Sequence, residues 1–319
     1  WQLTQGYRKM NPKKLWTIEL KNEIFGGLAP TLDPFDNTKF YLSDGWGSAY
    51  PSIKLRQFSL QDGKELNAVS VKNLVRCLYF NVDQKSLFVI SDSKILHINK
   101  IDFSIIKKFE KGIPKYSDYV SSNDQDTLLL MNTYADFLSV YNYKSEKVTR
   151  KKLKTCKGIF KENDDKYLIF CPEIGSVYQY DLSRNTLNHI LQTDIFYQVY
   201  NSTSDKFYFH VGKIVKSTSS THEKIEPTHE INIYLKSDLT QKSELKFDFS
   251  FEKFIVSKDE EKIYCVNNNQ ILIYSLPKKQ ITSKIILDEK VRIAEIFDEQ
   301  QLFLTYEYDH SNILTCWKL

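Results

Sequence analysis

The stretch Asn163–Thr186, NDDKYLIFCPEIGSVYQYDLSRNT, contains one unit of a pattern that recurs along the chain. A polar turn at Asn163–Lys166 precedes an apolar strand at Tyr167–Phe170, and a loop with Gly175 leads into an alternating strand at Val177–Asp181. β-Branched and aromatic residues favour strands, whereas Asp, Asn, Ser and Gly favour turns. The stretch therefore predicts two neighbouring strands of a repeating β unit.

The same turn-then-strand signal occurs seven times. Its apolar strands begin at Phe40, Leu87, Leu128, Tyr167, Phe207, Ile263 and Leu302, and the following strands begin at Ile53, Ile95, Leu138, Val177, Ile231, Ile271 and Ile313. A period of about 40 to 45 residues, with four strands in each copy, is the signature of a propeller blade. We therefore predict an all-β fold, a seven-bladed β-propeller of four-stranded antiparallel blades, formed by residues 1–319 as a single domain.

The seventh copy is one strand short, since it supplies only residues 292–297, 302–306 and 313–318. Residues 14–20, KLWTIEL, alternate apolar and polar side chains and precede the first copy. We predict that an N-terminal strand within residues 13–21 pairs beside residues 313–318 and completes the last blade. This pairing would cover an otherwise free strand edge.

The strand segments KFYLSD, SLFVIS, KYLIFC and KIYCVN, followed by SVYQYDL, FLSVYNY and QILIYSL, resemble those of the WD-repeat and YVTN-type seven-bladed propellers. Tyr180–Asp181 is the nearest match to the Trp-Asp pair of WD repeats, no Gly-His pair occurs, and the turns carry Asp without the Gly of YVTN-type turns. The chain resembles a divergent member of this superfamily. The resemblance implies that ligands bind the face formed by the loops between second and third strands and between blades.

Composition excludes several classes of protein. A net charge of +4 over 44 basic and 40 acidic residues is too dilute to predict a nucleic-acid partner. No uncharged run reaches the roughly 18 residues of a membrane span.

Five cysteines occur without a CxxC pair. Cys77, Cys171, Cys265 and Cys316 lie in apolar strand patterns, so we expect buried thiols and no disulfide framework. Unpaired thiols favour a reducing, cytoplasmic compartment. Because the chain begins at Trp1, the alternative of a secreted or anchored protein whose signal has been removed also stays open.

Three loops between second and third strands are long, and insertions in repeats often mark the binding face. They are DGWGSAYPS at 44–52, EYDHSN at 307–312, and an insertion in the fifth copy at 211–230. The first and seventh copies would be neighbours in a closed ring. The predicted recognition cluster is therefore Trp46, Tyr50, Tyr308, Asp309 and His310. The alternative is that Trp46 and Tyr50 pack over the blade edge.

The insertion in the fifth copy also carries candidate partner-binding residues, His222 and His229. Together with Glu223, Glu226 and Glu230 they could hold a divalent metal, but their spacing matches no established motif. We predict a solvated polar loop there and no metal site. His97 and His210 lie in strand patterns and are predicted to be packed and hydrogen-bonded.

A basic run covers the outer strand of the third copy and enters the fourth: Lys144, Lys147, Arg150, Lys151, Lys152, Lys154, Lys157 and Lys161. Two interpretations stay open. The lysines protect a free strand edge from pairing, or they attract phosphates or an acidic partner.

No motif predicts catalysis. The chain has no GxSxG, Walker A or GxGxxG sequence, and the acidic pairs Asp164/Asp165 and Asp259–Glu261 lie in turns, where Asp caps its own backbone. We therefore predict no catalytic residues and no cofactor. The predicted function is a non-catalytic platform that binds a protein or peptide, while a small-molecule ligand stays open. The alternatives are a propeller enzyme or enzyme subunit of the lactonase, lyase or quinoprotein-dehydrogenase kind, and a binder of carbohydrate or cell-surface ligands.

Overall fold

The computed structural model describes residues 7–23, 28–44, 53–132, 136–153, 156–201, 205–216, 223–307 and 312–319. The chain divides into two compact units, one formed by residues 1–19 with 196–319 (unit 1) and one by residues 20–195 (unit 2). The two units are described separately below. The prediction of a single domain over residues 1–319 stays a prediction.

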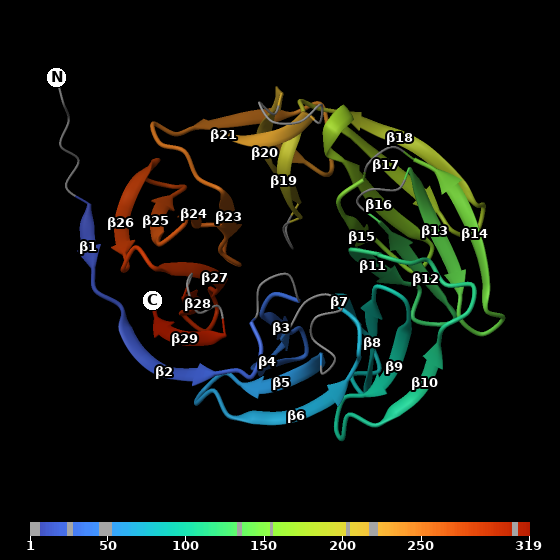
Figure 1. Ribbon diagram of the computed structural model, residues 1–319. Helices are drawn as coiled ribbons and strands as arrows, with labels where there is room; N and C mark the ends of the chain where they lie inside the picture. The colour runs from blue at the N-terminus through green and yellow to red at the C-terminus, as the bar shows by residue number, and fades with distance from the viewer. Residues whose placement is uncertain are drawn as a thin grey trace. The chain divides into compact units, whose positions relative to one another are not determined.

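Unit 2 contains four blades, each a sheet of four antiparallel strands (Figure 1). The first blade comprises β3 (Thr31–Asp33), β4 (Asp36–Asp44), β5 (Lys54–Ser59) and β6 (Glu65–Ser70). The second comprises β7 (Val75–Phe80), β8 (Ser86–Ser91), β9 (Ile95–Asn99) and β10 (Ile105–Phe109). The third comprises β11 (Tyr119–Ser122), β12 (Thr127–Met131), β13 (Phe137–Asn142) and β14 (Lys147–Lys152). The fourth comprises β15 (Ile159–Lys161), β16 (Lys166–Cys171), β17 (Ser176–Asp181) and β18 (Thr186–Gln192), with the short 3-10 helix η1 (Pro172–Ile174) between β16 and β17.

Unit 1 contains three blades. The fifth blade comprises β19 (Phe196–Asn201), β20 (Lys206–Lys216), β21 (Glu223–Leu235) and β22 (Lys242–Lys246). The sixth comprises β23 (Lys253–Val256), β24 (Lys262–Asn267), β25 (Gln270–Ser275) and β26 (Gln280–Ile286). The seventh comprises β27 (Val291–Phe297), β28 (Leu302–Glu307), β29 (Ile313–Lys318) and, from the N-terminal region, β2 (Lys13–Glu19). The described strands thus form seven four-stranded antiparallel blades, as predicted.

The predicted completion of the last blade is confirmed. β2 runs antiparallel to β29, with pairs from Lys13↔Lys318 to Glu19↔Ile313. The side-chain hydroxyls of Thr17 and Thr315 also form a hydrogen bond of 3.1 Å across the two strands. β2 therefore covers the strand edge that β29 would otherwise expose.

One strand was not predicted. β1 (Arg8–Met10) pairs in parallel with β26 and makes the sixth blade a five-stranded sheet. The side chain of Met10 packs against the core cluster that contains Ile271 and Ile285. Three residues are too few to show a period of two in the sequence, so no pattern identified this strand.

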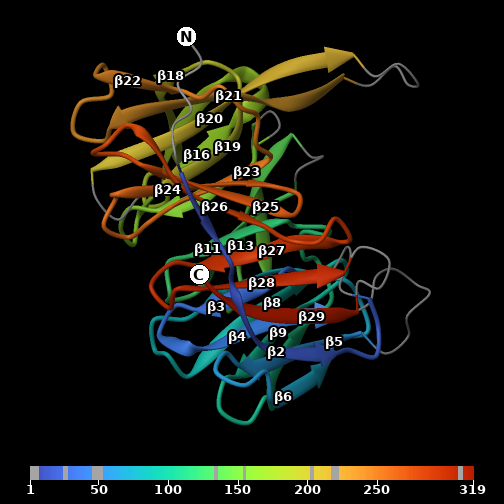
Figure 2. The same cartoon turned by 90° about the vertical axis from the view of Figure 1, so that its left-hand side faces the viewer.

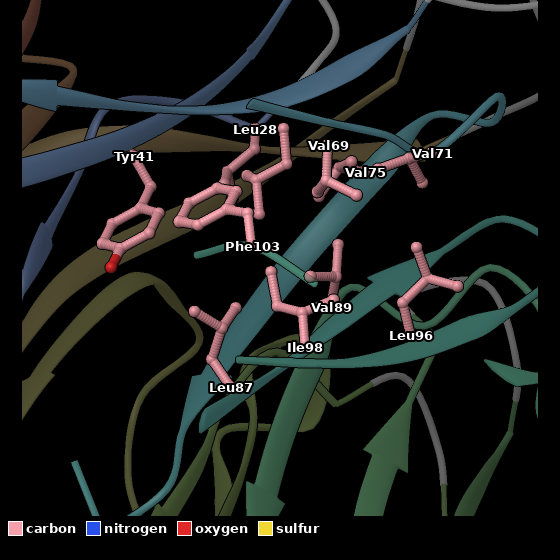
Figure 3. Close-up of a cluster of buried hydrophobic side chains, with 11 residues drawn as sticks. Leu28, Tyr41, Val69, Val71, Val75, Leu87, Val89, Leu96, Ile98 and Phe103 are labelled. Atoms are coloured by element: carbon pink, nitrogen blue, oxygen red, sulfur yellow. The ribbon is translucent and has the colours of Figure 1, made fainter. Parts of the chain in front are cut away.

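The second strand of each blade is its most buried element. All six residues of β8 and all five of β12 are buried. Both faces of these strands are apolar because each packs against the sheets on its two sides. Figure 3 shows one such cluster, in which Tyr41 of the first blade lies near Leu87 and Phe103 of the second. Outer strands are far more exposed, as in β10, where only Phe109 is buried.

Each blade has two kinds of end. We call "turn end" the end with the tight turns that join the first to the second strand and the third to the fourth. We call "loop end" the opposite end, where the second strand leads into the third and one blade leads into the next. The recognition cluster is predicted for the loop end.

The insertion in the fifth blade differs from the prediction. The sequence predicts a polar loop at 211–230, but β20 and β21 continue through residues 211–216 and 223–230, with pairing as far as Lys216↔Glu223. Figure 2 shows these two strands projecting beyond the rest of their sheet. The β-branched residues Ile214, Val215 and Ile225 explain the strands, since they favour extended backbone. A register shift between His210 and Gly212 marks the point where the projecting hairpin leaves the blade.

The cysteines also differ in part from the prediction. Cys156 and Cys171 form a disulfide, and both are buried. Cys77, Cys265 and Cys316 are free thiols, as expected, but only Cys265 and Cys316 of these three are buried, whereas Cys77 is partly exposed. The burial of Cys171 was predicted correctly, but the expectation of no disulfide is wrong because the link before β15 brings Cys156 to the end of β16. Spacing along one chain does not reveal that contact. This pair also removes the argument that unpaired thiols indicate a reducing compartment.

Candidate functional site

Most of the predicted recognition cluster cannot be placed. Trp46, Tyr50, His222, Tyr308, Asp309 and His310 lie outside the described residues. His229 is the predicted site residue that the structure does describe, and it is exposed on β21 in the projecting hairpin. Its backbone carbonyl accepts a hydrogen bond of 2.9 Å from the N–H of Phe247. The formation of this recognition cluster therefore stays a prediction.

The base of the first-blade loop is described and is rigidly held. Asp44 ends β4 and is fully buried. The Arg56 guanidinium donates to the Asp44 carboxylate at 3.1 Å and to Glu65 at 2.6 Å. The side-chain amide of Asn22 donates to the same Asp44 carboxylate at 3.4 Å. These bonds fix the strand ends from which residues 45–52 depart.

The two strand histidines are packed, as predicted. The His210 ring stacks on Phe251 with centroids 4.2 Å apart, and its Nε2 lies 2.8 Å from the carbonyl oxygen of Thr228. Burial lowers the pKa of His210 to about 4. His97 stacks on Phe88 at 4.5 Å, and burial lowers its pKa as well. Both rings are therefore neutral near pH 7 and act as parts of the core.

The acidic turns have a structural role that goes beyond capping. Asp259 does cap its own turn, since its carboxylate accepts the backbone N–H of Glu261 at 3.0 Å. In the turn with Asp164 and Asp165, however, the cap is the side chain of Asn163, which accepts two backbone N–H groups. The expectation that Asp caps this second turn is therefore wrong, because Asn163 occupies the first position of the turn.

Some turn acids also connect neighbouring blades. Asp124 of the third blade accepts hydrogen bonds from the Tyr79 hydroxyl of the second blade at 2.6 Å and from the Lys161 ammonium of the fourth blade at 2.5 Å. In unit 1, Glu260 of the sixth blade accepts from Tyr208 of the fifth at 3.0 Å. Burial and the nearby carboxylate raise the pKa of Tyr208. These contacts give Asp124 and Glu260 a role in packing between blades.

A cavity of about 610 Å³ lies at the turn end of the first two blades, in unit 2. We call it the Phe35 pocket. Its lining consists of Phe35, Asp36, Lys39, Gln57, Leu66, Asn67, Gln84, Lys100 and Ile101. Its volume is in the range of pockets that hold small ligands or side chains of a partner. It lies at the end opposite to the predicted site.

Two lining residues of the Phe35 pocket, Gln57 and Lys100, belong to a buried polar network. The Lys100 ammonium lies 2.7 Å from the carboxylate of Asp33, which is fully shielded from solvent. Asp33 also accepts the hydroxyl of Tyr41 at 3.1 Å, and Tyr41 in turn accepts the side-chain amide of Gln57 at 2.7 Å. Burial and the negative charge of Asp33 raise the pKa of Tyr41. Because each charge of this network has a partner, the network is close to neutral.

The rim of the Phe35 pocket is apolar. The side chains of Phe35, Leu66 and Ile101 are 41%, 40% and 75% exposed. Phe35 and Ile101 occupy turn positions, which polar residues usually fill. Apolar residues in the turns of two consecutive repeats were thus the signal in the sequence that could have indicated this pocket.

A smaller cavity, of about 290 Å³, lies at the loop end between the second and third blades. We call it the Arg150 cleft. Ile113, Pro114 and Phe137 supply its apolar wall, and the Arg150 guanidinium lies 4.8 Å from the centroid of the Phe137 ring. Lys115 adds a second basic side chain to its lining. The cleft shows that basic residues of the third blade reach the loop end.

Within the described ranges, no three His, Cys, Asp or Glu side chains lie together as a metal ion would require. None of the helical segments described is long and apolar enough to cross a membrane.

No family model and no curated protein sequence matches the chain. Solved structures do match. The Neurospora crassa Pan2 WD40 domain aligns with a TM-score of 0.71 at 10% identity, covering 97% of both chains. The β-propeller domain of Myceliophteria thermophila Cps50 (Swd1) aligns with a TM-score of 0.66 at 9% identity, covering 94% of this chain and 99% of that one. The C-terminal WD40 domain of Sif2 aligns with a TM-score of 0.63 at 14% identity, covering 98% and 99%. With its seven four-stranded blades, the chain therefore has the seven-bladed β-propeller fold of WD40 domains.

Proposed function

We propose that this protein is a non-catalytic platform that binds a protein or peptide partner. The observation that supports the proposal is the gathering of exposed apolar side chains in the first two blades. Of the twelve large apolar side chains exposed among the described residues, six lie at the turn end or on the outer strand of these blades: Phe35, Leu66, Val82, Ile101, Ile105 and Ile106. Exposed apolar surface rimmed by polar groups is typical of protein interaction sites.

The Phe35 pocket supplies the chemistry that a peptide requires. Its apolar rim would take an aliphatic or aromatic side chain as an anchor. Asn67 and Gln84 bring side-chain amides to the lining, and such groups can both donate to and accept from a peptide backbone. The amide of Asn67 is already oriented by hydrogen bonds to Gln57 and to the carbonyl of Ile101. A partner would therefore meet a pre-organised surface.

Charge in this pocket favours a neutral anchor. Asp36 and Lys39 form an ion pair of 2.8 Å, and Lys100 is paired with Asp33. The Asp36 carboxylate has a pKa lowered to about 2, since hydrogen bonds from Lys39 and Thr38 outweigh the effect of its burial. The pocket thus presents balanced charge at neutral pH.

The loop-end cluster around Trp46 and His310 belongs to the same proposed function as a second candidate surface. It rests on the sequence alone. Among the described residues, no arrangement of side chains favours the enzyme or carbohydrate alternatives over protein binding.

The proposal can be tested with a displayed library of random peptides selected on the immobilised protein. Peptides recovered are then measured by fluorescence anisotropy against the wild-type protein and the Ile101→Asp variant. A charge in the apolar rim should weaken binding at least about tenfold. The Ile214→Asp variant is a matched control, because Ile214 is also exposed but lies on the projecting hairpin. It should bind as the wild type does.

A double Trp46→Ala and His310→Ala variant separates the two faces. Peptides that bind the Ile101→Asp variant normally but lose affinity for this double variant would place recognition at the loop end. Recovery of no binding peptide from the library would contradict peptide recognition.

A further inference from the structure

β14 differs from the other outer strands of unit 2 in its regularity. All six of its residues pair with β13 without a register shift. The pairings of β6, β10 and β18 with their neighbouring strands each contain a shift or bulge. Bulges twist an edge and hinder the addition of another strand. β14 is thus the one outer strand described in unit 2 whose edge stays regular over its whole length.

Six basic residues on and beside β14 lack an ion-pair partner among the described residues, whereas Lys161 is paired with Asp124 and Asp164. Lys144, Lys147, Arg150, Lys151, Lys152 and Lys157 form no ion pair within 4.0 Å among the described residues. On the neighbouring outer strand β10, by contrast, Lys107 pairs with Glu146 at 2.9 Å. Lysines on a free edge discourage pairing with a second copy, because like charges would face each other. The same lysines would attract an acidic strand, because its charges are opposite to theirs.

The alternation of side chains along β14 puts cations on both faces of the sheet. Lys147, Thr149 and Lys151 point to one face, and Val148, Arg150 and Lys152 to the other. Every second residue of an edge strand also directs its backbone N–H and C=O outward. An extended segment lying along β14 would thus meet backbone groups in its plane and cations above and below.

The chain already contains an example of strand addition to an outer strand. β1 pairs with the free side of β26 through Arg8↔Ser283, Lys9↔Lys284 and Met10↔Ile285. The register shift between β25 and β26 lies before Ser283, so β1 adds to the regularly paired part of β26. An outer strand can therefore accept a further strand where its pairing is regular.

We infer that β14 binds an extended acidic segment of a partner protein, which adds to the third blade as a fifth strand. The Arg150 cleft at the loop end of β14 would take an apolar side chain at one end of that segment. A polypeptide suits this edge better than a nucleic acid, because only a polypeptide continues the backbone ladder. The inference goes beyond the proposed function, since it concerns a different surface and a partner of different charge.

The test uses the whole protein and a short fluorescein-labelled peptide with blocked ends, made of repeated Glu-Glu-Val units. The peptide should bind in fluorescence anisotropy and should slow hydrogen exchange at the amides of β14. The double variant Lys147→Glu and Lys152→Glu should lose affinity at least about tenfold. Both side chains are exposed, so the variant should fold, which circular dichroism checks. The control Lys108→Glu reverses an exposed charge on β10 and should bind as the wild type does.

A second peptide distinguishes strand addition from attraction between charges. It has the same sequence but an N-methyl group on every backbone amide, which removes the N–H donors on both edges of the peptide and leaves every charge in place. Weak binding of this peptide, with no protection of β14, supports the inference. Equal binding of the two peptides would overturn it.

An oligothymidylate competes in the same assay. Three results together would overturn the inference: the oligothymidylate displaces the parent peptide, the β14 charge reversals weaken the binding of the oligothymidylate, and N-methylation does not change the binding of the peptide. β14 would then be a general site for polyanions. Failure of any of these tests leaves the result for Ile101→Asp unchanged, so the two proposals fail separately.

Discussion

His210 illustrates how single residues of this protein serve packing rather than chemistry. Its ring is fully buried between aromatic side chains, and its Nδ1 atom has no hydrogen-bond partner. With Nε2 facing the carbonyl of Thr228, the neutral ring carries its proton on that nitrogen. Protonation of Nδ1 would place an uncompensated charge in the core of unit 1.

This burial predicts a loss of stability in mild acid. The folded-state pKa of His210 is about 4, below the ordinary value of 6.5. Below pH 6.5 the unfolded chain binds a proton that the folded chain does not, so the free energy of unfolding falls as the pH drops to about 4. The total loss is about 3 kcal/mol. Urea unfolding across this range should show the decrease, and a His210→Gln variant should flatten it.

The control for that experiment is His97→Gln. The pKa of His97 is lowered by burial too, but its ring is partly exposed, so this substitution should change the slope less. A His210→Gln variant with the wild-type pH dependence would show that His210 is not the titrating group.

At the scale of elements, turns and links contribute contacts that the strands alone do not show. The turn acids Asp124 and Glu260 join blades through tyrosine hydroxyls, and η1 ends at Gly175 with a positive φ of 59°. A side chain at Gly175 would put its Cβ 2.3 Å from the carbonyl oxygen of Thr193. Glycine is thus required where the loop between β16 and β17 passes close to the backbone that follows β18.

The disulfide between Cys156 and Cys171 is the strongest link of this kind, and we predict that it stabilises unit 2. It joins residues separated by 15 positions, and a closed loop of that length contributes about 3 kcal/mol. Thermal unfolding with and without a reductant should show a lower Tm in the reduced protein. The double variant Cys156→Ala and Cys171→Ala should melt at one temperature under both conditions. An unchanged Tm after thiol titration has confirmed reduction would refute the prediction.

A feature can be predicted from the sequence when it depends on residues that are close together along the chain, and not when it depends on contacts between distant segments. The segment Ile313–Lys318 was predicted with the bounds that the structure has, because alternation and turn residues are local properties. The contacts of Asp124 and the Phe35 pocket depend on which side chains meet across neighbouring blades, and the disulfide depends on where the link before β15 meets the end of β16. That information lies in the packing of whole sheets and is absent from any short stretch of sequence.

The projecting hairpin was mispredicted for a different reason. Its polar composition indicated a solvated loop, but Ile214 pairs with Ile225 across the two strands and Lys224 pairs with Glu226 at 2.9 Å. Charged residues on the faces of an exposed two-stranded ribbon look like loop residues in the sequence. The candidate site was hardest to predict, since its recognition cluster depended on long loops that lie for the most part outside the described residues.

At the scale of the whole molecule, the repeated blades separate stability from recognition. The second strands are buried, while turns, loops and outer strands differ from blade to blade in charge and exposure. The Phe35 pocket is balanced in charge and apolar at its rim, whereas β14 is basic and regular. One scaffold can thus present surfaces suited to different partners.

Removal of residues 1–21 should destabilise the protein as a whole. It takes away β1 and β2 and leaves the edge of β29 open to pairing with other chains. We expect the Tm to fall by about 10 °C or more, given about 2–4 °C for each kcal/mol, and light scattering to detect aggregates. Removal of residues 1–11 alone spares β2 and should have a smaller effect. A chain without residues 1–21 that melts like the full chain would contradict this role of β2.

The pairing of β2 with β29 also determines when the seventh blade can form during translation. Thr17 and its partner Thr315 are 298 positions apart, so a ribosome that adds roughly 5–20 residues per second needs about 15 to 60 s to make the second after the first. Throughout that interval the Trp16 segment has emerged into solvent without the strand it is destined to join. The seventh blade is therefore the last to be finished during translation, and the earliest strand of that blade must be kept from other partners until then.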